Sequence, residues 1–134
     1  MAYSNVSDIQ KLYANIVFDA SSPVTSADIE TKHIPKADAY IDARLRSRYE
    51  TPISVDGDLE LMRLISSNLA AGFVAEVLYE TSQQPNDQAS ARQRRDFAEG
   101  LLDQIMAGTA ALETPRKPLA GIVGAVASAA RGGA

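Results

Sequence analysis

The side chains that could do acid–base or metal chemistry are few and mostly acidic. Asp38 and Asp42 are four residues apart, which places both carboxylates on one face of a helix. Paired carboxylates can bind a metal ion or transfer protons. No histidine and no third carboxylate is spaced to complete such a site. We therefore interpret this pair as part of a solvated helix face.

A second acidic group, Asp56, Asp58 and Glu60, partly resembles a calcium-binding loop. It lacks the remaining ligands and the loop length that such a site needs. The better interpretation is an ordinary turn over residues 55–58, in which Asp58 caps the helix that follows.

The other reactive side chains do not form an enzyme motif. His33 is the single histidine and stands just before Pro35, while the serine pairs at 21–22 and 66–67 lack a G-x-S-x-G elbow. There is no glycine-rich phosphate loop. The absence of cysteine excludes thiol nucleophiles, disulfides and cysteine-based metal sites. The sequence predicts no enzyme, no cofactor and no metal.

Arginine outnumbers lysine seven to three in residues 1–107. These side chains fall into two groups, Arg44, Arg46, Arg48 and Arg63, and Arg92, Arg94 and Arg95. They form either solvated faces beside nearby acids or ion pairs between subunits, a role that arginine fills better than lysine. Aromatic residues are not interleaved with them, as single-strand binding would require.

Length and charge describe one domain with two parts. The chain has 134 residues with 46% hydrophobic residues, enough for one domain with its own core. The net charge of −4 argues against a protein that coats nucleic acid. Residues 1–107 carry ten basic and sixteen acidic side chains, or −6, whereas residues 108–134 carry three and one, or +2. We therefore predict a helical body over 1–107 and an arm over 108–134.

Targeting and membrane signals are also missing. Residues 1–10 lack a basic flank and an apolar run, and the apolar stretch Leu119–Ala130 is too short to span a bilayer. We expect the protein to be made in a reducing cytoplasm, or to act in a particle assembled there.

Hydrophobic periodicity predicts an all-α protein, a small bundle of about four helices with an extended Gly/Ala-rich C-terminal arm. The expected helices are a short one capped at Ser7–Asp8, one from Ser26 to Tyr49, one over Leu59–Glu80 and one from Asp87 to Ala107. Pro35 predicts either a break at residues 33–34 or a new start with the proline in the first turn. The third helix is apolar nearly all round, which is typical of a helix that is central in a bundle or buried in an oligomer. On the fourth helix, we expect Phe97 to face inward with residues 101, 102, 105 and 106.

The arm contains five of the eight glycines, and Pro115 and Pro118 bracket Arg116 and Lys117. Small residues at 122–127 offer little bulk for a core of their own. Two interpretations stay open: a tail without a fixed structure, or an arm that becomes ordered against a neighbouring subunit or partner.

Two segments resemble the head–tail connector proteins of Mu-like tailed phages. The opening Met1-Ala2-Tyr3, followed by a short helix ending in Leu12-Tyr13, is similar to the start of that family. The more specific match is the run Ala37-x-x-x-Ile41-Asp42-x-x-Leu45-x-x-Arg48-Tyr49-x-x-Pro52-Ile53, within which Arg48-Tyr49-x-x-Pro52 is most characteristic. The apolar helix ending in Leu78-Tyr79 continues the similarity, which covers about residues 1–107. The Gly/Ala-rich arm departs from the family pattern.

The resemblance implies a structural virion protein, a head–tail connector adaptor that forms a ring under the portal and completes the DNA-filled head. It implies a homo-oligomer, commonly a dodecamer, with the portal protein and a tail-side stopper or tail terminator as partners. Genomic DNA would pass through the channel without sequence-specific binding, and the protein would be assembled in the bacterial host cytoplasm. The interface candidates are Arg44, Arg48, Tyr49, Arg92, Arg95, Arg116, Lys117, Ile122, Val123 and Val126.

Two other functions stay open on the residues alone. A helical DNA-binding regulator would need a short turn before a basic recognition helix, and the breaks between the expected helices are longer than that. A small inhibitor-type bundle that acts by binding another protein is compatible with the composition.

Overall fold

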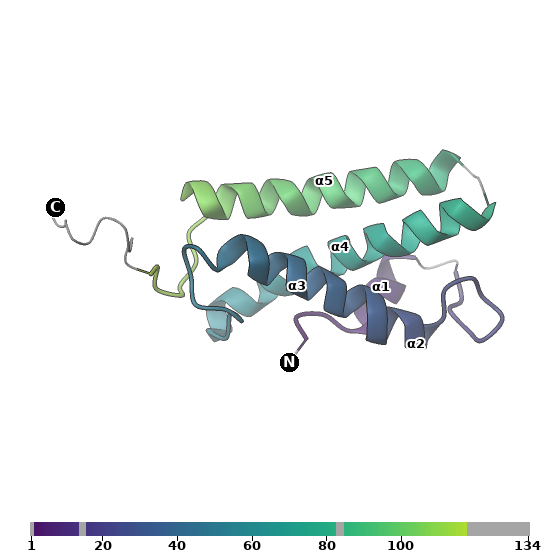
Figure 1. Ribbon diagram of the computed structural model, residues 1–134, viewed down its shortest axis with the longest axis horizontal. Helices are drawn as coiled ribbons and strands as arrows, with labels where there is room; N and C mark the ends of the chain where they lie inside the picture. Colours follow the sequence, from purple (N-terminus) through teal and green to yellow (C-terminus); the bar gives the residue numbers. More distant parts are fainter. Residues whose placement is uncertain (1, 14–15, 83–84, 118–134) are drawn as a thin grey trace, which may run out of the picture.

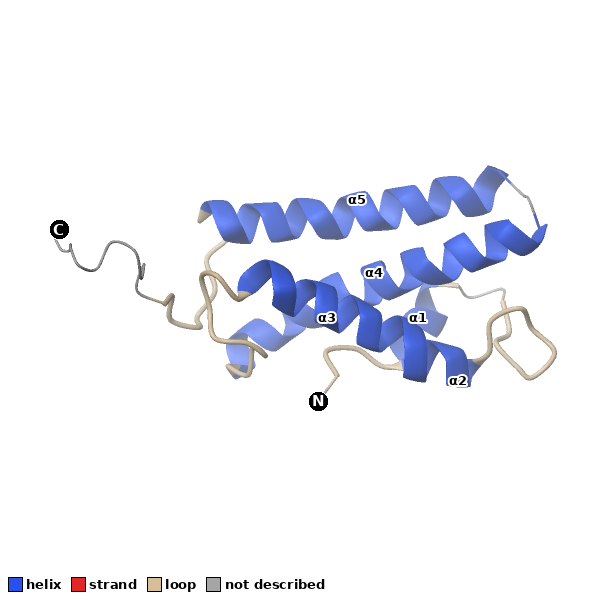
Figure 2. Cartoon of the chain, viewed as in Figure 1, coloured by secondary structure: helices blue, strands red, loops and turns tan. Residues whose placement is uncertain are grey.

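Two long antiparallel helices, α4 (Asp56–Ser82) and α5 (Pro85–Ala107), form the frame of the molecule. The protein is described by a computed structural model, which covers residues 2–13, 16–82 and 85–117. In the view of Figure 1, α3 (Ile34–Leu45) crosses in front of α4, and the short α1 (Val6–Leu12) lies below it. Figure 2 shows that helices and loops make up the described chain, so the predicted all-α bundle is confirmed.

Helix α4 is the central element. Every residue from 65 to 75 is buried, because α1, α3 and α5 each pack on a different side of it. This explains why its apolar residues are not confined to one stripe. Among the described residues, α4 is also the one helix long and apolar enough to cross a membrane, but 67% of that apolar window is buried inside the bundle.

Helix α5 packs on α4 through a narrow stripe of small and aliphatic side chains. Ala91, Ala98, Leu102 and Ile105 are buried. At Gly72 of α4, a β-carbon would lie 2.8 Å from Cγ of Arg95, which shows how closely the two helices approach. The prediction that Phe97 faces inward is wrong, because its side chain is 48% exposed. Ala98 occupies the inward position, and Phe97 is displaced by one residue, about 100° around the helix.

The first two helices begin with reciprocal side-chain caps. Oδ1 of Asn5 accepts from Asp8 N at 3.0 Å, and Oδ2 of Asp8 accepts from Asn5 N at 3.0 Å. Thr25 and Asp28 make the same pair of bonds before α2 (Ser26–Asp28). The cap of the first helix is therefore Asn5 rather than the predicted Ser7–Asp8, whereas the second helical region begins at Ser26 as predicted, with Thr25 as its cap. In both boxes the acid is the third helical residue, where it also complements the helix dipole.

Pro35 is accommodated by a widened turn. Residues Ile29–His33 form a π-helical turn between α2 and α3, and Ile34 N–H donates to the Ile29 carbonyl five residues earlier. Pro35 then lies in the first turn of α3, where its missing N–H costs least. The second of the two predicted outcomes is therefore correct, although the helical path continues through the wide turn.

Helix α3 ends at Leu45, four residues before the predicted end at Tyr49. Residues 46–48 form a turn that places Tyr49 opposite Arg116 in an isolated antiparallel bridge. Gly108 closes α5 with φ +85°, a backbone conformation that glycine adopts without strain. The chain then returns across the end of the bundle, so packing continues to Lys117, beyond the predicted boundary at residue 108.

Candidate functional site

The run that carries the family resemblance lies mainly in the core. Its aliphatic and aromatic members Ala37, Ile41, Leu45, Tyr49 and Ile53 are all buried. Tyr49 is only 1% exposed, so its side chain cannot form part of an interface in this fold. The interface role predicted for Tyr49 is therefore wrong, and the alternative role, packing where the helix ends, is the one the structure supports.

The turn after α3 holds the end of the described chain. Arg48 O accepts from Lys117 N at 2.7 Å, and Lys117 Nζ donates to Arg46 O at 2.9 Å. Glu50 lies 3.8 Å from the same ammonium group. Lys117 is thus engaged within its own chain. The Nε atom of Arg48 is buried without a hydrogen-bond partner in the described structure.

Asp58 anchors the segment that follows α5. Its carboxylate accepts from Glu113 N at 2.7 Å, from Thr114 N at 2.7 Å and from Thr114 Oγ1 at 2.5 Å. Burial alone would raise the pKa of Asp58, but these three hydrogen bonds outweigh it and lower the pKa below its ordinary value. The prediction that Asp58 caps its own helix is wrong. It lies inside α4 and binds the returning chain instead.

A polar network ties the N-terminal segment to α3 and α4. Asp38 accepts from Tyr3 N at 3.0 Å and from Ser66 Oγ at 2.6 Å, and Asp42 accepts from Tyr3 Oη at 2.5 Å. Tyr3 Oη also accepts from Ile53 N at 2.7 Å. The two aspartates therefore do not form a solvated face, as predicted, because residues 3–4 cover them.

Burial dominates the titration of this network. It raises the pKa of Asp38 above its ordinary value, with the Asp42 charge adding to it, even though Ser66 and Tyr3 donate to the carboxylate. Burial and the hydrogen bond to Asp42 also raise the pKa of Tyr3. Both groups are held in place by their bonds, and the hydroxyl of Tyr3 keeps its proton at neutral pH.

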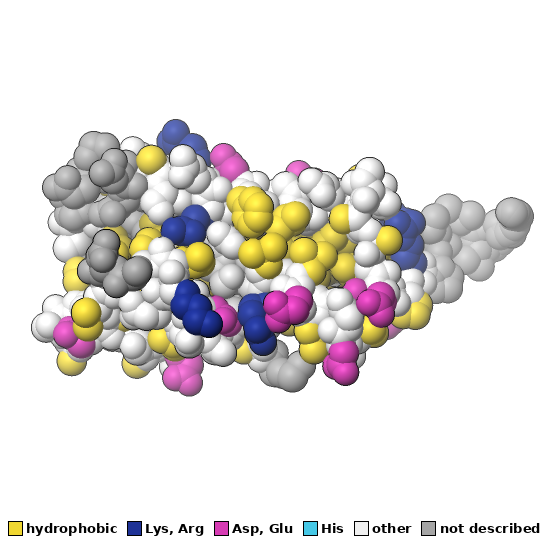
Figure 3. All heavy atoms as spheres, turned by 180° about the vertical axis from the view of Figure 1, so that it is seen from behind, with side chains coloured by type: hydrophobic (Ala, Val, Ile, Leu, Met, Phe, Trp, Pro, Cys, Tyr) yellow, Lys and Arg dark blue, Asp and Glu magenta, His cyan; other side chains and the backbone are white. Residues whose placement is uncertain are grey.

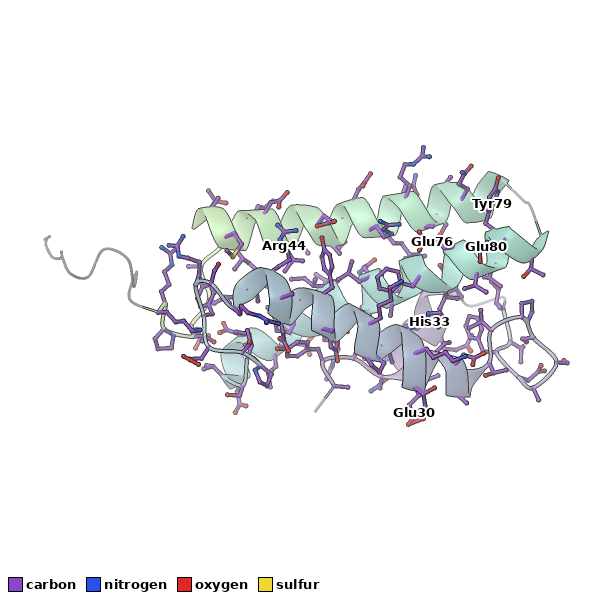
Figure 4. All side chains as sticks on the ribbon, in the orientation of Figure 1. Glu30, His33, Arg44, Glu76, Tyr79 and Glu80 are labelled. Carbon is purple, nitrogen blue, oxygen red and sulfur yellow. The ribbon has the colours of Figure 1, made fainter. Side chains whose placement is uncertain are left out.

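Arg44 links α3 to α5 (Figure 4). Its guanidinium group is 2.6 Å from Glu99 Oε1 and 2.5 Å from Asp103 Oδ1, and Tyr40 Oη donates to the same Glu99 oxygen at 2.6 Å. The hydrogen bond to Asp103 is the main cause that raises the pKa of Arg44. Arg44 was predicted at an interface between subunits, but its charge is matched inside one chain.

A groove of about 810 Å³ opens where α3 diverges from α4 and α5. Figure 4 shows His33 approaching it from the start of α3 and Glu76, Tyr79 and Glu80 from α4. Its walls carry both signs of charge, from Lys32, Lys36, Arg92 and Arg95 and from Glu76, Glu80, Asp96 and Glu99. Lys36 Nζ lies 4.2 Å from the centre of the Phe73 ring on the floor. Burial lowers the pKa of His33.

The arginines of α5 have different surroundings. Arg95 pairs with Glu76 within the groove, and Arg94 packs over the Tyr13 ring and donates to Leu12 O at 3.2 Å. Arg92 is exposed and pairs with no other described residue. Of the predicted interface candidates, Arg92 and Arg116 are therefore the ones left exposed without an ion pair in the described chain. Ile122, Val123 and Val126 lie outside the described residues.

An apolar patch lies on the rear face of α4 and α5, as Figure 3 shows by the hydrophobic side chains gathered near its middle. Leu64 is 41% exposed and Phe97 is 48% exposed. Leu61 and Leu101, one turn before Leu64 and one turn after Phe97, are partly buried against the core. We call Leu61, Leu64, Phe97 and Leu101 the rear patch. The sequence does not predict the rear patch, because its pattern places Phe97 on the inward face of its helix.

No group of three or more His, Cys, Asp or Glu residues in the described ranges is placed to hold a metal ion. No family model, no curated protein and no solved structure matches the chain.

Proposed function

We propose that this protein is a head–tail connector adaptor, a structural virion protein that forms a ring beneath the portal of a tailed phage. The observation that carries the proposal is the place of the resembling run in the fold. Residues 37–53 form the buried side of α3 and the chain that follows it. Ile53 N donates a hydrogen bond to Tyr3 Oη near the N-terminus, and Arg48 O accepts one from Lys117 N at the other end of the described chain. The same run therefore positions both ends of the described chain.

The distribution of charge supports the same role. The helical body carries −6 over residues 1–107. Fixed negative charge on a channel wall repels phosphate groups, so DNA can slide past without binding. The slightly basic arm leaves the body beside the turn after α3, where it can contact the portal or a neighbouring subunit.

Ion pairs within one chain reduce the number of charged side chains that are left to contact a neighbouring subunit of the ring. Arg44 and Arg95 are matched by acids of their own chain, and Lys117 is engaged with Glu50 and Arg46 O. Arg92 keeps an unmatched charge at the edge of the groove. We therefore assign Arg92 to the contact between ring subunits.

The test is co-expression of the full chain with the portal protein of the same phage, followed by negative-stain imaging of the purified complex. We expect a twelve-fold ring on the portal, and we expect Arg92→Glu to reduce ring recovery by at least about tenfold, which corresponds to about 1.4 kcal/mol. Arg46→Glu is the matched control, because Arg46 is also exposed. Failure of the wild-type protein to bind the portal would reject the proposed function.

A further inference from the structure

The rear patch is the strongest surface feature that the fold leaves without an occupant. Glu99 and Asp103 on α5 reach Arg44 of α3, and Ser66 on α4 reaches Asp38 of α3. Phe97 lies two residues before Glu99, and Leu64 lies two residues before Ser66. Two residues correspond to about 200° around a helix, so both side chains point away from α3. The patch therefore faces away from α3, whereas the groove opens beside α3.

The size of the patch fits a short segment better than a whole subunit. Two side chains that are 41% and 48% exposed leave on the order of 150–200 Å² uncovered. A stable interface between two proteins buries about 800 Å² on each partner. The patch by itself is therefore too small for a dimer contact but matches one or two turns of a docked peptide.

The chain supplies a segment with matching character. Residues 118–134 follow Lys117, and Leu119, Ile122, Val123 and Val126 have the i, i+3, i+4, i+7 spacing that puts apolar side chains on one helix face. Arg131 is the single charged residue in that stretch. The groove suits this segment poorly, because its walls carry eight charged side chains.

The starting point of the segment favours the patch of another copy. Lys117 is held beside Arg46 and Arg48, at the end of α3. In Figure 1 this end lies on the front of the bundle, whereas the patch is on the rear face shown in Figure 3. Leu119 can lie no more than about 7 Å from Lys117, and neighbouring helices are already about 8–10 Å apart. Leu119 therefore cannot contact the rear patch of its own chain, whereas the patch of another copy can receive the whole stripe from Leu119 onward.

We propose that residues 119–126 of one copy dock on the rear patch of the next copy, with Val123 packed against Phe97. This inference rests on the proposed function in that a head-to-tail contact, repeated around a closed ring, gives every arm one patch. It also explains why two large apolar side chains, Leu64 and Phe97, are exposed side by side with the charged surface of the rear face.

Engineered disulfides test the contact directly, because the chain has no cysteine of its own. Phe97→Cys chains labelled with ¹⁵N are mixed with unlabelled Val123→Cys chains, oxidised and analysed by mass spectrometry. We expect a mixed disulfide between the two kinds of chain, at least about tenfold above that between Val123→Cys and Asp96→Cys chains. Asp96→Cys is the matched control because Asp96 is also exposed on α5 but lines the groove. Leu64→Cys in place of Phe97→Cys should give the same result.

Two outcomes would overturn the inference. One is a yield of mixed disulfide, with both Phe97→Cys and Leu64→Cys, that is equal to the yield of the Asp96→Cys control. The other is a bridge within one chain in the Phe97→Cys/Val123→Cys double variant, without mixed products. The portal experiment is scored separately. A mixed disulfide without a ring on the portal would support this contact and reject the adaptor function. A ring on the portal without the mixed disulfide would support the adaptor function and reject this contact.

Discussion

Both ends of the described chain are held by aspartates, the buried Asp58 and the partly buried Asp38, yet the pKa values of these two carboxyl groups shift in opposite directions. At the C-terminal anchor, Asp58 receives three hydrogen bonds from Glu113 and Thr114, and its pKa is lowered. At the N-terminal network, Asp38 receives two, and its pKa is raised. Burial raises the pKa in both cases.

The groups around each carboxylate decide whether its pKa is raised or lowered. Asp58 has no other carboxylate among the causes of its shift, whereas Asp38 lies one helical turn from Asp42 and feels its charge. A third donor therefore outweighs burial at one site, and a neighbouring acid adds to burial at the other. The C-terminal anchor stabilises the fold through an ionised carboxylate, while the N-terminal network depends more on Tyr3.

The largest expected effect is at the C-terminal anchor. Asp58→Ala leaves two backbone N–H groups and the Thr114 hydroxyl without their acceptor at a residue that is only 4% exposed. We expect the free energy of unfolding to fall by about 3 kcal/mol, measured by urea denaturation followed by circular dichroism. Asp56→Ala, in the same helical turn but exposed, should cost less than about 1 kcal/mol. Equal losses for the two variants would show that residues 113–114 are not anchored by Asp58.

The N-terminal network should respond to loss of one hydroxyl. Tyr3→Phe removes the donor to Asp42 and the acceptor for Ile53 N, which is a buried group. We expect a loss of about 2 kcal/mol in the same denaturation assay. Tyr79→Phe serves as the control, because the Tyr79 hydroxyl has no hydrogen bond in the described structure, and it should stay within about 0.5 kcal/mol of the wild type. A loss at Tyr79 as large as that at Tyr3 would contradict the assigned role of the network.

The smallest effect is a difference in pH dependence. The pKa of Asp38 is 3.8 in the unfolded chain and is higher in the folded protein. The contribution of Asp38 to stability therefore declines as the pH rises from 3.8 through the folded-state pKa. The pKa of Asp58 is lower in the folded protein than its unfolded value of 3.8. The contribution of Asp58 to stability is therefore present above pH 3.8 and is lost as the pH falls through the folded-state pKa. Asp38→Asn should therefore gain stability relative to the wild type as pH rises through that window, and Asp58→Asn should lose stability relative to it. Denaturation midpoints measured from pH 3 to pH 7 test both signs, and two curves that move together would contradict the comparison.

The sequence by itself determined the helices and their order. The apolar run within residues 59–80 is too rich in large side chains for one stripe, so it predicts the central helix that α4 forms. Pro35, Pro52 and the turn residues near 83–86 predict the breaks between helices. These properties depend on neighbours within about four residues along the chain, and that range is visible in a sequence.

Only the tertiary structure decided which polar side chains meet. Asp58 and Thr114 are 56 residues apart, and Tyr3 and Asp38 are 35 apart, so spacing gave no sign of either contact. The sequence predicts Arg44 at an interface, but in the structure it pairs with Glu99 and Asp103 of α5. The sequence predicts Phe97 in the core, but in the structure Ala98 occupies the inward position. In each case the result depends on the angle and separation at which two helices pack, which the side chains of both helices set together.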